Sequence, residues 1–368
     1  MMNKIPKGWE KYYLSDCFNA ISIKNKIKTK DYLPQGKFPI IDQGQDFISG
    51  YSNDENLLIK VKKPIIIFGD HTRCFKFINF DFIAGADGIK ILEPKDNFNE
   101  KLFYYFCQIL DFPNKGYSRH FQYLKKAIIN FPKNLSEQKA IVDKLDDSFA
   151  KIENAITNLI NAKENLKLYK QSVLKSAFNG DLLPNTSPTQ RKKVKFEDVL
   201  KYEQPTKYIV KSTKYNNDFK TPVLTAGKGF ILGYTNETEG IFTNTPVIIF
   251  DDFTTSSQYV NFHFKVKSSA MKILRPVDNV NLKFLFYKMQ TIQHKSDTHK
   301  RYWISEYAKL EIPLPTLSEQ NLIVAEIDRR FAIVDKTLNL IDKSIQNAKN
   351  LKQSILKKAF SGELRSDI

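Results

Sequence analysis

Leu135-Ser136-Glu137-Gln138 returns as Leu317-Ser318-Glu319-Gln320, 182 residues later in a chain of 368. The end of the following segment repeats as well: Gln171-Ser172-Val173-Leu174-Lys175-Ser176-Ala177-Phe178-Asn179-Gly180 matches Gln353-Ser354-Ile355-Leu356-Lys357-Lys358-Ala359-Phe360-Ser361-Gly362. Residues 135–182 therefore align with 317–364 without a gap. Because a repeat at a fixed offset sets the architecture, the chain is predicted to be an internal duplication.

The repeated segment has the apolar pattern of a long pairing helix. Apolar residues recur at alternating steps of three and four, which is a heptad seam. The seam comprises Val142, Leu145, Phe149, Ile152, Ile156, Leu159, Leu166, Val173 and Ala177 in the first copy, and Val324, Ile327, Phe331, Val334, Leu338, Ile341, Ile345, Ala348, Ile355 and Ala359 in the second. Ser136 and Ser318 are predicted N-caps, and Gly180 and Gly362 suit the left-handed position after a helix.

A helix over most of residues 135–182 would be about 65 Å long at ~1.5 Å per residue. Its narrow apolar stripe needs a partner helix, and the nearest available partner is the other copy. We predict that the two helices form an antiparallel coiled coil, with the globular domains related by a pseudo-twofold axis. Such a rod alone would indicate a spacer or a scaffold.

The regions before the two helices also match, more loosely. Pro64-Ile65-Ile66-Ile67-Phe68-Gly69-Asp70 parallels Pro246-Val247-Ile248-Ile249-Phe250-Asp251-Asp252. Short apolar runs bounded by Gly, Pro and Asn are typical of strands, and residues 102–109 and 284–292 have the pattern of amphipathic helices. The predicted fold class is therefore α+β (mixed α/β), with two globular domains that are each followed by a long helix.

The loops between the matched segments differ. His71-Thr72-Arg73-Cys74 follows the first apolar run, whereas Phe253-Thr254-Thr255-Ser256 follows the second. This is expected if each copy recognises a different target on one scaffold, although neutral drift of the loops would give the same pattern. Arginine suits guanine and glutamine suits adenine, so these loops carry candidate DNA-binding residues. The candidates are Gln43, Gln45, His71, Thr72, Arg73, Lys76, Arg119, His120, Lys228, Thr254, Thr255, Ser256, Gln258, Arg301 and Tyr302.

The chain is strongly basic, with 57 Lys and Arg against 40 Asp and Glu and a formal net charge of +17. This excess indicates a polyanionic partner, either nucleic acid or an anionic membrane, or else a basic solvated surface. No segment has the ~20 consecutive apolar residues of a membrane span, and none resembles a signal peptide. We therefore expect a cytoplasmic protein that binds nucleic acid.

Motifs for catalysis and metal binding are missing from the sequence. The three Cys lack CxxC spacing and the five His are scattered, so no disulfide and no metal site is predicted. There is no Asn/Asp-Pro-Pro-aromatic tetrapeptide of a methyltransferase and no GxxxxGK[ST] phosphate loop. Glu93 and Lys95, with Asp81 or Asp87, faintly resemble a nuclease site, but the second copy has Arg275 in place of Glu93. An autonomous nuclease with a diverged site and a coiled-coil scaffold that binds acidic proteins are the alternatives to a DNA-binding subunit.

The layout resembles the DNA-specificity (S) subunits of type I restriction-modification systems. The resemblance rests on Ile5-Pro6-Lys7-Gly8-Trp9, on the two Leu-Ser-Glu-Gln junctions, and on the Ser-(Val/Ile)-Leu-Lys-x-Ala-Phe-x-Gly ends of both repeats. The second half lacks an equivalent of Trp9. The first junction, Phe131-Pro132-Lys133-Asn134-Leu135, is one residue longer than the second.

The resemblance implies a non-catalytic subunit whose two target-recognition domains read unlike half-sites around a fixed spacer. Residues 1–134 and 194–316 would be those domains, 135–182 and 317–368 the spacer helices, and 183–193 a linker. Two methylation (M) subunits and restriction (R) subunits would join the chain, so S-adenosylmethionine, ATP and Mg²⁺ would be used by partners and no cofactor by this chain. Candidate residues for helix pairing and partner docking are Leu145, Phe149, Ile152, Phe178, Ile327, Phe331, Val334 and Phe360.

Overall fold

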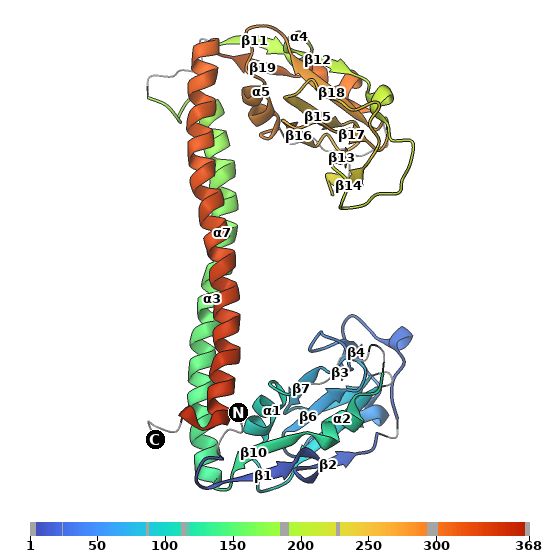
Figure 1. The fold of residues 1–368 in the computed structure, drawn as a ribbon, viewed down its shortest axis with the longest axis vertical. Coiled ribbons are helices and arrows are strands. Elements are labelled where there is room, and N and C mark those ends of the chain that lie inside the picture. Colours follow the sequence, from blue (N-terminus) through green and yellow to red (C-terminus); the bar gives the residue numbers. More distant parts are fainter. Residues whose placement is uncertain are drawn as a thin grey trace. The chain divides into compact units, whose positions relative to one another are not determined.

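The structure is a computed structural model of the chain. It describes residues 5–23, 25–85, 88–111, 116, 118–184, 191–225, 229–292 and 301–364. The chain divides into two compact units: unit 1 contains Met1–Leu159 and Asp342–Ile368, and unit 2 contains Ile160–Ile341. Each unit holds one globular domain and a part of both long helices, α3 (Leu135–Asn179) and α7 (Leu317–Ser361) (Figure 1).

The starts of the long helices differ from the prediction. Ser136 and Ser318 lie inside the first turn, so the prediction that they are N-caps is wrong. Asn134 Oδ1 accepts a hydrogen bond from the backbone N–H of Ser136 at 2.8 Å, and Thr316 Oγ1 accepts one from that of Glu319 at 3.3 Å. Asn134 and Thr316 therefore cap the two helices, since each satisfies an N–H group that has no partner within the helix.

The ends of the long helices agree with the prediction. Gly180 (φ 88°) and Gly362 (φ 83°) both adopt the left-handed conformation. At Gly362 there is a second reason for glycine, because an added Cβ would lie 2.5 Å from Cγ of Pro6. The proline of the opening motif thus packs against the end of α7 inside unit 1.

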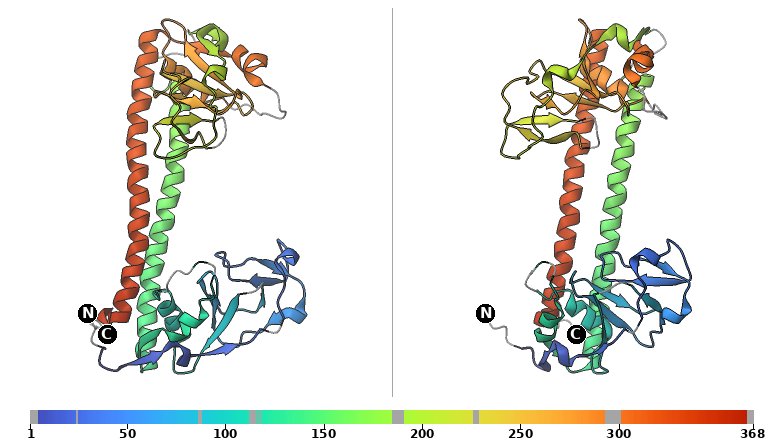
Figure 2. Two further views of the ribbon diagram at one scale, coloured as in Figure 1. Left: turned by 45° about the vertical axis from the view of Figure 1, so that its right-hand side comes forward. Right: turned by 90° about the vertical axis from the view of Figure 1, so that its right-hand side faces the viewer.

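The two long helices run antiparallel in each unit (Figure 2). In unit 1, Lys144 Nζ donates to the carbonyl oxygen of Leu364 at 3.4 Å, and Lys352 Nζ donates to Glu153 Oε1 at 2.7 Å. Partner numbers in α7 therefore fall as numbers in α3 rise. In unit 2, the C-terminal part of α3 shares a core with the N-terminal part of α7.

Lys163, Lys170 and Lys352 interrupt the apolar seam, and the last two are accommodated in the same way. Lys170 Nζ donates to Asp335 Oδ1 at 2.5 Å, as Lys352 does to Glu153. Each ammonium group also lies 4.7 Å from the centroid of a phenylalanine ring on the other helix. An acidic partner and an aromatic face thus hold a charge at an otherwise apolar position.

The residues predicted for helix pairing lie in these seams. Leu145, Phe149, Ile152, Phe178, Ile327, Val334 and Phe360 are buried, and Phe331 is half-buried. Because they pack inside their own unit, the buried side chains present no surface to another subunit. This corrects the part of the prediction that assigned them to partner docking.

The globular domain of unit 1 contains two four-stranded sheets. One sheet is antiparallel and is the larger because its strands are longer. Its order is β2 (Phe18–Ile21), β9 (Ile89–Pro94), β6 (Ile65–Gly69), β7 (Phe75–Ile78). The smaller sheet has the order β4 (Gly50–Ser52), β3 (Phe38–Ile41), β8 (Phe82–Ala84), β5 (Leu58–Ile59), with β3 and β8 parallel. The remaining elements are β1 (Trp9–Tyr13), which pairs with β10 (Ile128–Pro132), and helices α1 (Glu100–Cys107) and α2 (Phe121–Lys126).

The globular domain of unit 2 repeats this plan. Its larger sheet has the order β12 (Leu200–Glu203), β18 (Met271–Pro276), β15 (Val247–Asp251), β16 (Ser257–Val260). Its smaller sheet has the order β14 (Ile231–Thr235), β13 (Thr221–Leu224), β17 (Lys265–Val266). The remaining elements are β11 (Lys192–Lys195), which pairs with β19 (Glu311–Leu314), and helices α4 (Phe196–Val199), α5 (Leu282–Met289) and α6 (Tyr302–Ser305).

The central strand β6 is buried on both faces, which explains its unbroken apolar run. Ile66 and Phe68 belong to a core that includes α1 and parts of both long helices. Ile65 and Ile67 point to the opposite face and pack with Phe82 of β8. The residues of β15 are divided between two cores in the same alternating way.

The Leu-Ser-Glu-Gln motif fixes each globular domain to its helix through a buried glutamine. Gln138 Oε1 accepts from the backbone N–H of Asn99 at 2.6 Å, and its Nε2 donates to the carbonyl oxygens of Asn97 and Pro132 at 2.9 and 2.8 Å. Gln320 repeats two of these bonds in unit 2. Because Asn99 is the N-cap of α1, Gln138 joins the start of α1 to the start of α3.

A second link joins α1 to α3 further along the helix. Asp146 accepts hydrogen bonds from Lys101 Nζ at 2.6 Å and from the Tyr105 hydroxyl. Burial and this hydrogen bond raise the pKa of Tyr105 well above its usual value, so the hydroxyl stays a donor. Asp328 makes the equivalent pair of contacts with α5 in unit 2.

The structure supplies the equivalent of Trp9 that the second half of the sequence lacked. Trp9 Nε1 donates to Glu137 Oε1 at 2.8 Å, and Arg191 Nη2 donates to Glu319 Oε1 at 2.5 Å. Both donors come from the segment that begins the globular domain, and both acceptors lie in the first turn of a long helix. An arginine therefore takes the place of the indole.

The capping assignment predicts unequal effects for two neighbouring polar residues. Asn134→Ala should lower the free energy of unfolding by about 1 kcal/mol, because the first turn of α3 loses its capping acceptor. Ser136→Ala should change it by less than about 0.5 kcal/mol, because this exposed side chain lies inside the helix. Urea unfolding of both variants measures the difference, and an equal or larger loss with Ser136→Ala would contradict the assignment.

Candidate nucleic-acid interface

The turns of the β6–β7 and β15–β16 hairpins share one backbone conformation. The hairpins have equal length and matching strand register at an offset of 182 residues. Arg73 (φ 62°) and Thr255 (φ 59°) occupy equivalent positions and are both left-handed, which is uncommon for residues other than glycine. Arg73 N–H donates to Gly69 O at 2.8 Å, and Thr255 N–H donates to Asp251 O at 2.9 Å. The two copies thus present unlike side chains from the same turn.

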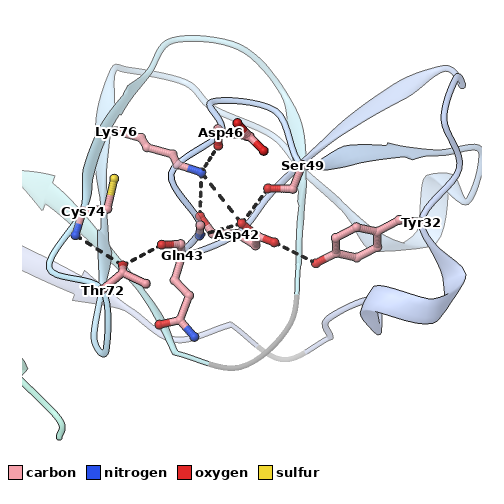
Figure 3. A network of polar contacts seen from close by, with 9 residues as sticks. Tyr32, Asp42, Gln43, Asp46, Ser49, Thr72, Cys74 and Lys76 are labelled. Atoms are coloured by element: carbon pink, nitrogen blue, oxygen red, sulfur yellow. Dashed lines mark hydrogen bonds and ion pairs between the residues drawn. The ribbon is translucent and has the colours of Figure 1, made fainter. Parts of the chain in front are cut away.

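In unit 1 the loop of residues 42–49, between β3 and β4, is tied to the β6–β7 hairpin (Figure 3). Lys76 Nζ, from β7, donates to the carbonyl oxygens of Asp42 and Asp46 at 2.9 and 2.5 Å. The Asp42 carboxylate accepts from Ser49 Oγ at 2.6 Å and from the Tyr32 hydroxyl at 3.4 Å. Lys76 and Tyr32 therefore hold the start and middle of the loop from other elements, and the Ser49–Asp42 hydrogen bond joins the two ends of the loop to each other.

Gln43 connects the same loop directly to the turn. Thr72 Oγ1 donates to Gln43 O at 2.6 Å, and the backbone N–H of His71 donates to Gln43 Oε1 at 3.2 Å. Thr72 Oγ1 also accepts from the backbone N–H of Cys74 at 3.3 Å. Two of the predicted contact residues, Gln43 and Thr72, thus hold the turn in shape.

In unit 2 the carboxylate of Asp251, the last residue of β15, braces the turn. Asp251 Oδ1 accepts from the backbone N–H groups of Phe253 and Thr254 at 2.9 and 3.3 Å. Its Oδ2 accepts from Thr254 Oγ1 at 2.7 Å. The same turn is therefore stabilised by different residues in the two copies.

Three predicted contact residues are buried, and the structure assigns them to support. Lys76 is 3 % exposed, His120 0 % and Tyr302 2 %. Burial lowers the pKa of Lys76. His120 N and Nδ1 both donate to Asp70 O, at 2.9 and 3.0 Å, and Tyr302 N donates to Asp252 O at 2.8 Å. Predicting these three as contact residues was wrong, because a buried side chain has no surface to offer a nucleic acid.

The other candidates reach the surface to different degrees. Six are exposed: Gln45, Arg119, Thr254, Ser256, Gln258 and Arg301. Five are half-buried: Gln43, His71, Thr72, Arg73 and Thr255. Lys228 lies outside the described residues.

Beside the turn of unit 1 lies a hollow of about 390 Å³, which brings together Gln45, Thr72 and Arg73. Gln108 and Asp111, which follow α1, complete its polar lining. Sequence reasoning missed both residues, because the hollow is formed by three segments far apart in the chain. Their only signal in the sequence was a polar pair at the end of an amphipathic helix.

Phe47 was also missed. Its side chain is 49 % exposed on the loop next to Gln45, and its ring lies edge-on to Phe80 at 6.0 Å between centroids. A large aromatic residue in a stretch rich in polar residues and glycine, from Gln43 to Gly50, was the available signal. An exposed ring of this kind can pack on a base or on a thymine methyl group.

The described residues also include side chains of the metal-binding types and three thiols. Within the described ranges, no cluster of three or more His, Cys, Asp or Glu side chains is arranged to hold a metal ion. The thiols of Cys17, Cys74 and Cys107 are free; burial raises the pKa of Cys17 to about 12 and raises the other two as well. These thiols are therefore poor nucleophiles at neutral pH.

No helix in the described part of the chain combines the length and apolarity needed to cross a membrane.

Residues 6–162 match the family model of the type I restriction modification DNA specificity domain. Over this part, the chain is similar to the specificity subunits of type I restriction enzymes. It is 47 % identical over 149 residues to the EcoR124I/EcoR124II specificity subunit of Escherichia coli, a match that covers 37 % of each chain. The EcoDI specificity subunit of Escherichia coli is 25 % identical over 276 residues, covering 62 % of this chain and 61 % of that relative. The matched region thus spans less than two thirds of both relatives.

Two solved structures support the fold over nearly the whole length. A chain from a structure of complex assembly and conformational transition in the type I R-M system aligns with a TM-score of 0.70 at 17 % identity, covering 97 % of this chain and 98 % of that one. The HsdS subunit from Thermoanaerobacter tengcongensis aligns with a TM-score of 0.52 at 18 % identity, covering 98 % of both chains. The predicted fold class, with two globular domains and two long helices, is confirmed.

The bracing by Lys76 predicts a local effect on the loop of residues 42–49. Lys76→Met keeps the length of the side chain but leaves the carbonyl groups of Asp42 and Asp46 without their donor, which costs about 1–3 kcal/mol. Amide hydrogen exchange in residues 42–49 should therefore become about tenfold faster or more. The exposed Lys37, changed to Met, is the matched control. Unchanged exchange in the loop of the Lys76 variant would refute the bracing.

Proposed function

We propose that the chain is the sequence-specific DNA-binding subunit of a type I restriction-modification complex, and that its two domains read the two unlike halves of a bipartite target. The observation that carries the proposal is the shared turn of the two hairpins, which holds Arg73 in one copy and Thr255 in the other. A common backbone with unlike polar side chains is what two related recognition modules for different sequences require.

The charge of the chain supports double-stranded DNA as the partner. A net charge of +17 favours binding to a polyanion. Arg119 and Arg301 are exposed at equivalent positions, each next to the residue whose backbone bonds to the aspartate at the base of the turn. We assign these arginines to phosphate contacts, since phosphate contacts position a module and leave the reading of bases to others.

The two long helices are proposed to set the spacing between the half-sites. Each is a continuous helix of 45 residues, or about 67 Å at ~1.5 Å per residue. A stiff element of this length can span half-sites one DNA turn apart, ~34 Å, which present the same groove to both modules. The family resemblance supplies the remaining partners: two methylation subunits, and restriction subunits, in the cytoplasm. S-adenosylmethionine, ATP and Mg²⁺ would serve those partners.

The proposal is tested by co-expressing the chain with methylation subunits and mapping methyladenine across the host genome by single-molecule sequencing. A bipartite motif with two unlike halves and a fixed spacer is expected. A soluble complex that adds no methylation, together with DNA binding that depends only weakly on salt, would contradict it, because phosphate contacts impose a steep salt dependence.

Exchange of the turns predicts a change in one half-site only. Residues 71–74 are replaced by Phe-Thr-Thr-Ser, the sequence of residues 253–256, which should fit because the two turns share one backbone. Methylome mapping should show one altered half-site, with the other half and the spacer unchanged. The reverse graft into residues 253–256 is the matched control and should alter the opposite half. Loss of both halves in a protein that still folds would contradict modular reading.

A further inference from the structure

The hollow in unit 1 combines groups of opposite charge in a way that no single loop could. Arg73 and Thr72 come from the β6–β7 turn, Gln45 from the loop of residues 42–49, and Gln108 and Asp111 from the segment after α1. The hydrogen bonds of Thr72 and Gln43 join the turn to the loop, so these two sides of the hollow are linked to each other. Asp111 itself is exposed.

These groups match one base pair. A guanidinium fork donates to O6 and N7 of guanine, while a carboxylate accepts from N4 of cytosine, and the major groove shows both edges side by side. We propose that the hollow receives the major-groove edge of a G·C pair in the half-site read by unit 1, with Arg73 on the guanine and Asp111 on the cytosine. This assignment rests on the proposed DNA-binding function.

The backbone of Arg73 is held in place for this contact. Its N–H donates to Gly69 O at 2.8 Å, and Gly69 N–H donates to Cys74 O at 2.9 Å, which closes the turn on both sides. The left-handed conformation is unfavourable for arginine, and glycine or asparagine would adopt it at lower cost.

The described residues of unit 2 do not offer the same combination. Thr255 stands at the position of Arg73, and threonine has no fork for a two-point contact with guanine. Gln290, the equivalent of Gln108, donates through Nε2 to Ser257 Oγ at 2.8 Å, on the β16 side of the turn. The same G·C contact is therefore available in unit 1 and not from the equivalent residues of unit 2.

The test compares methylation motifs of complexes that carry Arg73→Asn, Asp111→Ala or both. Asparagine tolerates the left-handed conformation, so the turn should keep its shape without the guanidinium. Each single variant should relax the same G·C position, with about a tenfold or greater loss of preference for that pair, and should leave the other half-site unchanged. Together the two changes should add little to either one, since both act on one base pair. Thr255→Ala, as the matched control, should leave this position intact.

The motif of the wild-type complex distinguishes failure of the G·C contact from failure of the proposed DNA-binding function. A bipartite wild-type motif that stays identical with Arg73→Asn refutes this inference and leaves the proposed function standing. The inference is also overturned if the two variants relax different positions. It is overturned as well if either variant weakens binding uniformly at all sequences, because that result marks a phosphate contact. Arg73→Lys keeps the charge without the fork and should relax the same position, which provides the readout should the asparagine variant fold poorly. Absence of any wild-type motif removes the proposed function and this inference together.

Discussion

The apolar seams of α3 and α7 are the constraint on which the rest of the structure depends. A helix of 45 residues with a narrow apolar stripe is not stable alone in water, and the two copies of one stripe cover each other in both units. Two of the lysines that interrupt the stripe, Lys170 and Lys352, make the same pair of contacts, each with an acidic residue and an aromatic ring of the other helix. Each unit therefore contains the same pair of packed helices, on which its globular domain is built.

The globular domains are then attached to this base by a small set of polar contacts. Gln138 and Gln320 join the first helix of each domain to the start of a long helix, and Asp146 and Asp328 join it again further along. The partners of these residues are buried or partly buried, so each lost bond would leave a group unsatisfied. The contacts that attach each globular domain to its long helix are therefore the same in both copies. The tips of the hairpins take no part in this attachment, and they differ. Under the proposed function, this arrangement would allow one fold to read two DNA sequences.

Much of this architecture could be predicted from the repeat. The heptad pattern gives the long helices and their pairing, because it depends only on residues close in the chain. The caps were placed wrongly, since Asn134, Ser136 and Thr316 are all good capping residues and only the structure shows where the helix begins. The equivalence of Trp9 and Arg191 was hidden because two unlike side chains donate to the same acceptor.

The candidate site was harder to predict, because residue type does not report burial. Lys76 and His120 look like contact residues, but their partners, Asp42 and Asp70, lie more than thirty residues away in sequence and bury them. Asp111 was missed for the converse reason, since its role in the hollow depends on elements that meet only in the fold. The predicted pseudo-twofold axis stays a prediction.

The most direct test of the account shortens the paired helices and reads the spacer. Residues 158–164 and 341–347 would be removed together, which keeps the register of the pairs Glu153–Lys352 and Lys170–Asp335. A heptad is close to two full turns, so the seam continues, and the pair becomes about 10 Å shorter. The account predicts that methylation either moves to a target with a spacer shorter by about three base pairs, at ~3.4 Å per pair, or is lost. An active complex with an unchanged spacer would contradict the claim that the helices set the distance between the half-sites.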